Sequence, residues 1–334
     1  MVSNIKRLKK KGLYNFSIVL FFVMLFLTSA SLYLAAAKID YVWRWNRVLK
    51  YFAYNNTVEI KTETDGTAVI VSNDKGWNIE ITKNSEQNIY FVPKKAKLNI
   101  LDGEYVYKEG IIGSYSELKA GILASGLWLT IKSSAIATIF GIIIGLICGI
   151  ARLSSNPFFK WSAITYVEII RGSPLLVQIF IWYFVFGSIL DAIFASHDFT
   201  RIEPIWYGIA ALAFFTGAYV GEIVRAGIQS INKGQAEAAR SLGMSGYQCM
   251  RYIILPQALK RILPPLAGQF INLIKDSSLL GIIAIRELTK ATREVISTSL
   301  QPFELWFMCA IMYLVLTFSL SMALQFLEKR SLIK

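Results

Sequence analysis

The chain has 334 residues, of which 54% are hydrophobic and 17% are charged. Soluble globular proteins carry about a quarter charged residues, so this composition predicts an integral membrane protein. The formal net charge is +13, but the excess lies in short segments beside apolar runs. Lys and Arg in such places mark the cytoplasmic side of a membrane. No basic groove with base-stacking aromatics occurs, which argues against a nucleic-acid partner.

The first apolar run covers residues 13–37 and follows five cations, Lys6, Arg7, Lys9, Lys10 and Lys11. It has the length of about 20 residues that crosses a bilayer, whereas a signal-peptide core is usually about 7–15 residues long. Residues 1–37 are therefore predicted to form a cytoplasmic basic tail and an N-terminal transmembrane helix. Ala35-Ala36-Ala37 resembles a cleavage site, so a removed signal peptide is the alternative.

Residues 38–115 are predicted to be an extracytoplasmic segment with a small β domain. Aromatic and basic residues mix between residues 41 and 54, which suits a helix at the membrane interface. From residue 57 the apolar residues alternate with polar ones, as in half-buried strands. Asp65-Gly66 and Asp102-Gly103 each separate two such runs, which predicts hairpins within a β meander over residues 57–108. The membrane lipid itself is an expected partner of the chain.

The remainder, residues 116–330, is predicted to be a helical membrane core with five spans, at about 118–151, 161–190, 204–229, 264–285 and 303–327. Alternation from a cytoplasmic N-terminus places residues 230–260 and the C-terminus in the cytoplasm. The predicted fold is thus an all-α membrane protein with a five-helix core. An extra N-terminal transmembrane helix and the small β domain precede that core.

The loop at about residues 230–256 carries the most informative motif. After Gly234 the chain runs through Glu237-Ala238-Ala239 to Gly243. This predicts a short helix over residues 235–242, ended by a glycine that can adopt the left-handed conformation. Ser245 and Gln248 have the spacing of a capping box, so a second short helix follows. An ordinary amphipathic loop helix, with Glu237 as a solvated charge, is the alternative interpretation.

These residues, together with Ile254-Leu255-Pro256, resemble the coupling-loop signature of binding-protein-dependent ABC importer permeases. Residues 168–178, 217–225 and 275–279 resemble the polar amino-acid branch of that family. The resemblance covers roughly residues 115–330 and implies a type I ABC importer permease core in the bacterial inner membrane. In that family the loop fits a groove on the ATPase subunit and transmits its movements to the membrane helices.

The resemblance also implies the partners. The chain contains no Gly-Lys pair and hence no Walker phosphate loop, so ATP and Mg²⁺ are expected on a separate ATPase dimer, with no cofactor on this chain. An extracytoplasmic amino-acid-binding protein and a second permease chain, identical or paralogous, complete the expected importer. With one histidine and three cysteines at no metal-ligand spacing, we expect no catalytic residues and no metal site.

Polar residues in the predicted span at 264–285 suggest a substrate path. A count from Pro264-Pro265 places Lys275 and Asp276 near the bilayer midplane, where a charge costs roughly 2.5–3.5 kcal/mol and is usually functional. Gln269, Asn272 and Asp276 share one helix face, and Ser277 and Ser278 follow. Lys275 and Asp276 offer one partner for each charge of an amino-acid zwitterion. A structural hydrogen-bond seam between helices is the alternative.

A helix break is predicted at Arg171-Gly172-Ser173-Pro174, since Pro174 withholds an N–H and disfavours helix at the preceding residue. Broken helices expose backbone groups to substrates in transporters. The alternative is a cytoplasmic helix joint in which Glu168 and Arg171 form an ion pair. Glu222 and Arg225 are interpreted as structural or gating charges.

The sequence does not identify the transported amino acid, although the neutral Gln269 and Asn272 favour a neutral or acidic side chain over a basic one. A different class of function also fits residues 38–117, namely a membrane-anchored sensor or scaffold that uses the β domain. That alternative explains the loop around Glu237 poorly.

Overall fold

The computed structural model describes residues 2–83, 86–197 and 199–332. The chain forms two compact units, Met1–Arg47 and Val48–Lys334. The first unit contains α1 (Val2–Lys38), of which Phe16–Lys38 is long and apolar enough to cross a membrane. The second unit contains both a β domain and a helical core. The prediction of an all-α chain was therefore too simple.

The interfacial helix predicted between residues 41 and 54 is wrong. Only two short 3₁₀ turns form there, η1 (Trp45–Arg47) and η2 (Leu49–Tyr51), and a strand already begins at Ala53. Tyr41, Trp43 and Trp45 recur every second residue, and neighbouring rings in this series lie 5.3 and 5.8 Å apart. Residues two apart lie on the same side of an extended chain, so these ring contacts fit an extended segment and not an α-helix.

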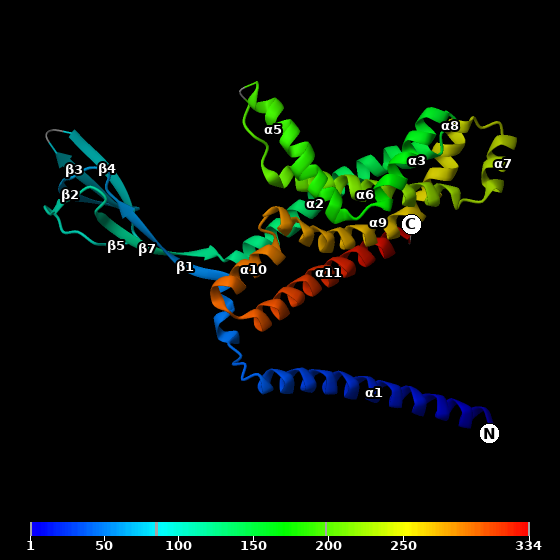
Figure 1. The fold of residues 1–334 in the computed structure, drawn as a ribbon, viewed down its shortest axis with the longest axis horizontal. Helices are drawn as coiled ribbons and strands as arrows, with labels where there is room; N and C mark the ends of the chain where they lie inside the picture. Colours follow the sequence, from blue (N-terminus) through cyan, green and yellow to red (C-terminus); the bar gives the residue numbers. More distant parts are fainter. Residues whose placement is uncertain (1, 84–85, 198, 333–334) are drawn as a thin grey trace. The chain divides into compact units, whose positions relative to one another are not determined.

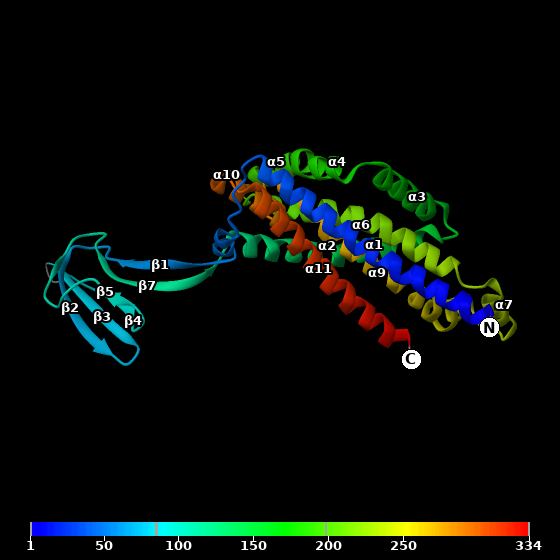
Figure 2. The same cartoon turned by 90° about the horizontal axis from the view of Figure 1, so that it is seen from below.

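The β domain extends from residue 53 to residue 120, further than predicted at both ends. Its strands in the described part of the chain are β1 (Ala53–Lys61), β2 (Gly66–Asn73), β3 (Gly76–Lys83), β4 (Glu86–Pro93), β5 (Lys97–Leu98), β6 (Tyr105–Val106) and β7 (Ile111–Ala120). One sheet has the order β4-β3-β2-β6, so the expected meander exists in β2, β3 and β4. In the other sheet β1 pairs along its length with β7, as Figure 2 shows.

Neither predicted Asp-Gly hairpin forms. The strands on either side of Asp65-Gly66, β1 and β2, belong to different sheets, and so do the strands around Asp102-Gly103. Gly66 instead allows close backbone packing, because a Cβ there would lie 2.6 Å from the carbonyl oxygen of Thr82. Asp102 accepts a hydrogen bond from Ile70 N at 2.8 Å. Asp65 forms an ion pair with Lys83 of β3. Both aspartates thus make contacts between segments rather than tight turns.

In the described residues, the helical core that follows the β domain is built from eight α-helices and two irregular segments. Their bounds are α2 (Ile122–Arg152), α3 (Pro157–Gly172), α4 (Leu175–Phe180), η3 (Ile181–Phe186), α5 (Gly187–Ala195), α6 (Pro204–Gln229), α9 (Leu255–Asp276), η5 (Ser277–Ile283), α10 (Leu288–Ser299) and α11 (Pro302–Leu332). In the described residues, five helices are long and apolar enough to cross a membrane, or six if a bent pair around η5 counts as one span. Six spans agree with the prediction of one N-terminal helix plus five.

Helices α2 and α6 pack along most of their lengths, and both contact α9 (Figure 1). Three glycines spaced four residues apart on α2, Gly141, Gly145 and Gly149, face Thr216, Val220 and Val224 of α6. A Cβ added to any of these glycines would come within 2.4–2.8 Å of the facing side chain. Small residues at this spacing let the backbones of membrane helices approach closely.

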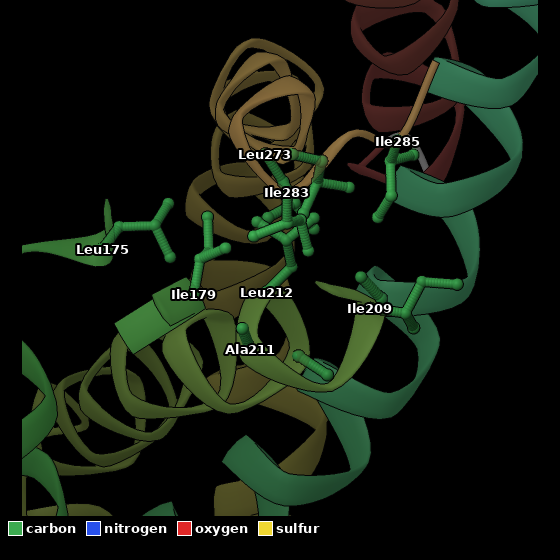
Figure 3. Close-up of a cluster of buried hydrophobic side chains, with 11 residues drawn as sticks. Leu175, Ile179, Ile209, Ala211, Leu212, Leu273, Ile283 and Ile285 are labelled. Carbon is green, nitrogen blue, oxygen red and sulfur yellow. The ribbon is translucent and has the colours of Figure 1, made fainter. Parts of the chain in front are cut away.

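The largest buried apolar cluster joins α4, α6, α9 and the segment after it. In Figure 3, Ile179 and Leu212 point toward Leu273 and Ile283, and all four side chains are at most 3% exposed. This cluster fixes the end of α9 that carries the predicted substrate path against α6. A second cluster places Val48, which is 1% exposed, among residues of α2, α10 and α11.

The span predicted at 264–285 does not begin at Pro264-Pro265. Both prolines lie inside α9, which begins at Leu255. Ala258 and Ile262 of the earlier turns are buried against α6, and Gly227 of α6 leaves room for Ile262. This packing holds the helix through the prolines, because neighbouring helices can compensate for lost backbone bonds in membrane helices. The predicted depth of Lys275 and Asp276 was counted from Pro264 as the first residue of the span. Because the helix begins earlier, that count no longer places them at the bilayer midplane.

Candidate functional site

The loop between α6 and α9 forms two short helices, α7 (Lys233–Ser241) and α8 (Gly246–Cys249). Gly243 has φ +79°, its N–H donates to Arg240 O at 2.9 Å, and Met244 N–H donates to Ala239 O at 3.1 Å. These two bonds make a Schellman motif, which satisfies the last carbonyls of α7. The capping box of Ser245 and Gln248 is present. The predicted local structure of the loop is confirmed.

The exposed surface of this loop differs in part from the expectation. Glu237 and Ala238 are exposed, as are Gly234 and Gly243, but Ala239 is buried against its own chain. On this surface Ala238 is therefore accessible and Ala239 is not. Leu242 is 83% exposed at the end of α7, an apolar contact that sequence reasoning missed. Its position directly before the terminating glycine was the available signal.

A π-helical turn, η4 (Met250–Ile254), joins the loop to α9. The Leu255 N–H donates to Met250 O, five residues back instead of four. Pro256 follows at the start of α9 and has no N–H to offer the carbonyl four residues earlier. The wider turn keeps one helix continuous from the loop to the polar end of α9.

At that end the predicted path residues divide into two groups. Asn272 and Lys275 are exposed, and Gln269, Asp276 and Ser278 are half-buried. Ser277 is fully buried, and its hydroxyl donates to Ile274 O at 2.8 Å. The stripe thus presents polar groups on the outside of α9, whereas Ser277 serves the turn where α9 passes into η5.

Lys275 and Ser278 line a shallow opening of about 300 Å³ with Thr289, Trp306 and Tyr313. Tyr313 OH donates to the carboxylate of Glu287 at 3.0 Å. Glu287 is completely buried and also accepts from the backbone N–H groups of Thr289 and Lys290, each at 2.7 Å. The opening therefore combines an ammonium group with hydroxyls held by a buried carboxylate. The roles of Glu287 and Tyr313 were not predicted from the sequence.

The helix break occurs where it was predicted. α3 ends at Gly172, Ser173 and Pro174 are extended, and α4 begins at Leu175. The buried side chain of Gln178 donates from Nε2 to Ile170 O at 2.7 Å and to Ser173 Oγ at 2.9 Å. Gln178 thus satisfies a carbonyl that the break leaves without a helical partner. This contact was not predicted from the sequence, because it depends on how the chain folds back after the break.

The charges near the break pair differently from the alternative considered above. In the part of the chain that the structure describes, Glu168 forms no ion pair with Arg171. Arg171 lies over the ring of Tyr219, 5.2 Å from its centroid. Glu222 forms ion pairs with Arg152 of α2 and with Arg225, whose Nε lies 3.1 Å from both carboxylate oxygens. This triad joins α2 to α6.

A proline-broken span, an accessible polar stripe on a second helix and an exposed helical loop between spans define a membrane transport subunit. The model of the family described as binding-protein-dependent transport system inner membrane component matches residues 141–332. The chain therefore belongs to the binding-protein-dependent transport system inner membrane components. It is the permease subunit of an ABC importer, a transport component rather than an enzyme.

Two relatives are named for glutamine transport. The probable glutamine ABC transporter permease protein GlnM of Bacillus subtilis (strain 168) is 39% identical over 205 residues, which are 61% of this chain and 91% of that protein. The glutamine transport system permease protein GlnP of Escherichia coli (strain K12) is 37% identical over 209 residues, which are 63% of this chain and 92% of that protein.

A solved structure of an amino acid ABC transporter with histidines is 38% identical, with a TM-score of 0.56. That similarity covers 63% of this chain and 94% of the other. Nearly the whole length of each of these proteins is thus matched, whereas more than a third of this chain is not. The family model begins at residue 141.

Proposed function

We propose that this chain imports a polar amino acid, of which glutamine is the first candidate. The observation that carries the proposal is the similarity to permeases named for glutamine transport, which extends over nearly their whole length. The chain forms half of the translocation path, and a second permease chain, identical or paralogous, supplies the other half. It lies in the bacterial inner membrane with both termini in the cytoplasm.

The exposed loop of α7 and α8 is the proposed contact with an ATPase dimer that holds ATP and Mg²⁺. Glu237, Ala238 and Leu242 offer a charge, a small contact surface and an apolar side chain on one exposed segment. Gly243 fixes the turn between the two short helices. Closure of the ATPase dimer displaces this loop, and η4 transmits the displacement to α9.

The polar end of α9 is the proposed substrate path. Gln269, Asn272, Lys275, Asp276 and Ser278 contribute both charges and neutral hydrogen-bonding groups there. An amino-acid zwitterion that loses water needs an anionic and a cationic partner. Lys275 in the opening beside Trp306 supplies the cation, and Asp276 supplies the anion.

The break at Gly172–Pro174 and the charges around it are the proposed gate. The two halves of a broken span can change their angle without unfolding either helix, because the break carries no backbone ladder of its own. Glu168 and Arg171 stay exposed beside it. Glu222 pairs with Arg225 of its own helix and with Arg152 of α2, and the second pair holds α2 and α6 together.

The test is ATP hydrolysis in proteoliposomes that contain this permease, the ATPase and the extracytoplasmic binding protein loaded with glutamine. We expect loaded binding protein to stimulate hydrolysis by the wild-type complex. Glu237→Lys and Gly243→Pro should abolish stimulation, because the first reverses the exposed charge and the second cannot adopt φ +79°. Uptake of labelled glutamine is measured on the same vesicles.

A matched control is Lys94→Gln, an exposed residue of the β domain, which should leave stimulation unchanged. Co-purification of the ATPase with each variant shows that the complex assembles. If the loaded binding protein and the loop substitutions leave hydrolysis unchanged in assembled complexes, the proposed coupling of hydrolysis to import through this loop is wrong. Residues 53–120 should then be tested as a sensor.

A further inference from the structure

A second cavity lies at the hairpin between α5 and α6, apart from the opening beside Lys275. It has a volume of about 460 Å³ and is lined by residues of η3, α5, the connecting segment and the first turn of α6. Small-molecule sites usually occupy about 300–1,000 Å³, are largely apolar and contain a few placed polar groups. Tyr183, Phe184 and Ile202 supply the apolar walls here.

The inner wall of this cavity carries a fixed carboxylate. Tyr207, which is 5% exposed, donates its hydroxyl to Asp191 Oδ1 at 2.9 Å. Gly187 packs against the Tyr207 ring, since a Cβ added there would lie 3.4 Å from a ring carbon, an ordinary van der Waals distance. The second oxygen of Asp191 remains available to a ligand.

The rim carries charges of both signs. Arg201 and Glu203 line the cavity and are exposed, and neither forms an ion pair within the described residues. Glu203 precedes α6 but makes no capping bond with its side chain. One cation and two carboxylates thus face a single cavity without neutralising one another.

The cavity lies at the mouth of the importer that receives substrate. Its lining residues Pro204 and Tyr207 begin α6, whereas the other end of α6 leads through Gln229 into the coupling loop. A helix of 26 residues spans about 39 Å at 1.5 Å per residue, which exceeds the hydrocarbon thickness of a bilayer. The cavity and the loop that contacts the ATPase are therefore on opposite sides of the membrane.

We propose that this cavity is an outer binding site for the α-ammonium and α-carboxylate groups of an amino acid. This site is distinct from the path at α9. The ammonium group binds Asp191 with help from Glu203, and the carboxylate binds Arg201. The inference rests on the proposed function, since it assigns the importer's substrate class to a second place on the same chain. In this cavity the substrate would bind after the binding protein releases it and before it enters the path at α9.

The test measures binding of labelled glutamine to the permease–ATPase complex in nanodiscs, without binding protein. Glutamine suits the site whatever the transported side chain is, because the proposed contacts involve only the α-ammonium and α-carboxylate groups. The experiment uses the Lys275→Met background, which removes the cation of the inner path. Binding that remains there should weaken at least tenfold in Asp191→Asn and less in Tyr207→Phe, which loses only the orienting hydroxyl.

The matched control is Asp74→Asn, an exposed carboxylate in the turn between β2 and β3, and it should not alter binding. N-acetylglutamine and glutamine amide each lack one α-charge, so both should compete at least tenfold less well than glutamine. Equal affinity of Asp191→Asn and Asp74→Asn, or undiminished competition by N-acetylglutamine, would overturn the inference. If the outer site is overturned in this way but loaded binding protein still stimulates hydrolysis, the proposal that the chain imports a polar amino acid stands. If binding at the cavity and stimulation of hydrolysis are both absent, both proposals are wrong.

Discussion

Substitution of Gly145 by alanine should destabilise the helical core, although alanine is the better helix former. The new methyl would lie 2.4 Å from Val220 Cβ and 2.9 Å from Gly217 O of α6. Carbon atoms in contact prefer about 3.5–4.0 Å, so α2 and α6 must separate locally by more than about 1 Å. Overpacking of this kind costs about 1–3 kcal/mol.

Gly268 of α9 provides a matched control. It also lies within a long helix, but a Cβ there would have no heavy atom within 4 Å. Replacing an unconstrained helical glycine by alanine stabilises by roughly 0.5–1 kcal/mol. The two glycine-to-alanine variants should therefore shift stability in opposite directions.

The measurement is the free energy of unfolding in mixed detergent and dodecyl sulfate micelles, followed by intrinsic tryptophan fluorescence. A third variant adds Val220→Gly to Gly145→Ala, which removes the side chain that the new methyl meets. Its destabilisation should be smaller than the sum of the two single effects. If Gly145→Ala and Gly268→Ala have the same effect, close approach of α2 and α6 does not explain these glycines.

Three further predictions concern polar contacts. Gln178→Leu should lower the unfolding free energy by about 1–3 kcal/mol and impair uptake, because carbonyls at the helix break lose their hydrogen-bond donor. Gln178→Glu also lacks the amide donor, so uptake by this variant should be impaired as well. Glu222→Gln should cost about 1–3 kcal/mol, since two half-buried arginines lose their counter-charge, and adding Arg152→Met should recover part of the loss if the triad is structural. The Lys83 ammonium, by hydrogen bonding, lowers the pKa of the exposed Asp65 carboxyl in the β domain. Its small stabilising effect should be present above the unfolded pKa of about 3.9 and disappear as pH falls through the folded value, so a Trp77 fluorescence titration of Asp65→Asn should lack this component.

Local sequence signals predicted the helical parts well. The span at 204–229 coincides with α6, because Pro204 suits a first helical turn and a long apolar run follows it. The break before Pro174 and the caps at Gly243 and Ser245 depend on backbone chemistry within a few residues, and they formed as predicted.

Features that depend on contacts distant in the sequence were missed or wrong. Asp65-Gly66 has the composition of a hairpin turn, but β1 finds its partner in β7, more than 50 residues later. Pro264 resembles a helix start, but packing of Ile262 against Gly227 extends the helix before it. The Gln178 and Glu222 contacts likewise require knowledge of which segments meet, which a single sequence does not contain.

The attachment of the β domain has a consequence for how such a chain can be assembled. Gly121 N–H donates to Phe52 O at 2.7 Å, so the entry and exit of the domain are one hydrogen bond apart. Val48 just before the entry and Leu123 just after the exit lie in the same buried cluster of the helical core. Residues 53–120 therefore form an inserted domain that is attached through the paired strands β1 and β7. A short loop from Phe52 to Gly121 could replace this domain without moving Val48 or Leu123 in the helical core. The core can gain, lose or exchange an outer domain at this junction while its membrane helices keep their packing.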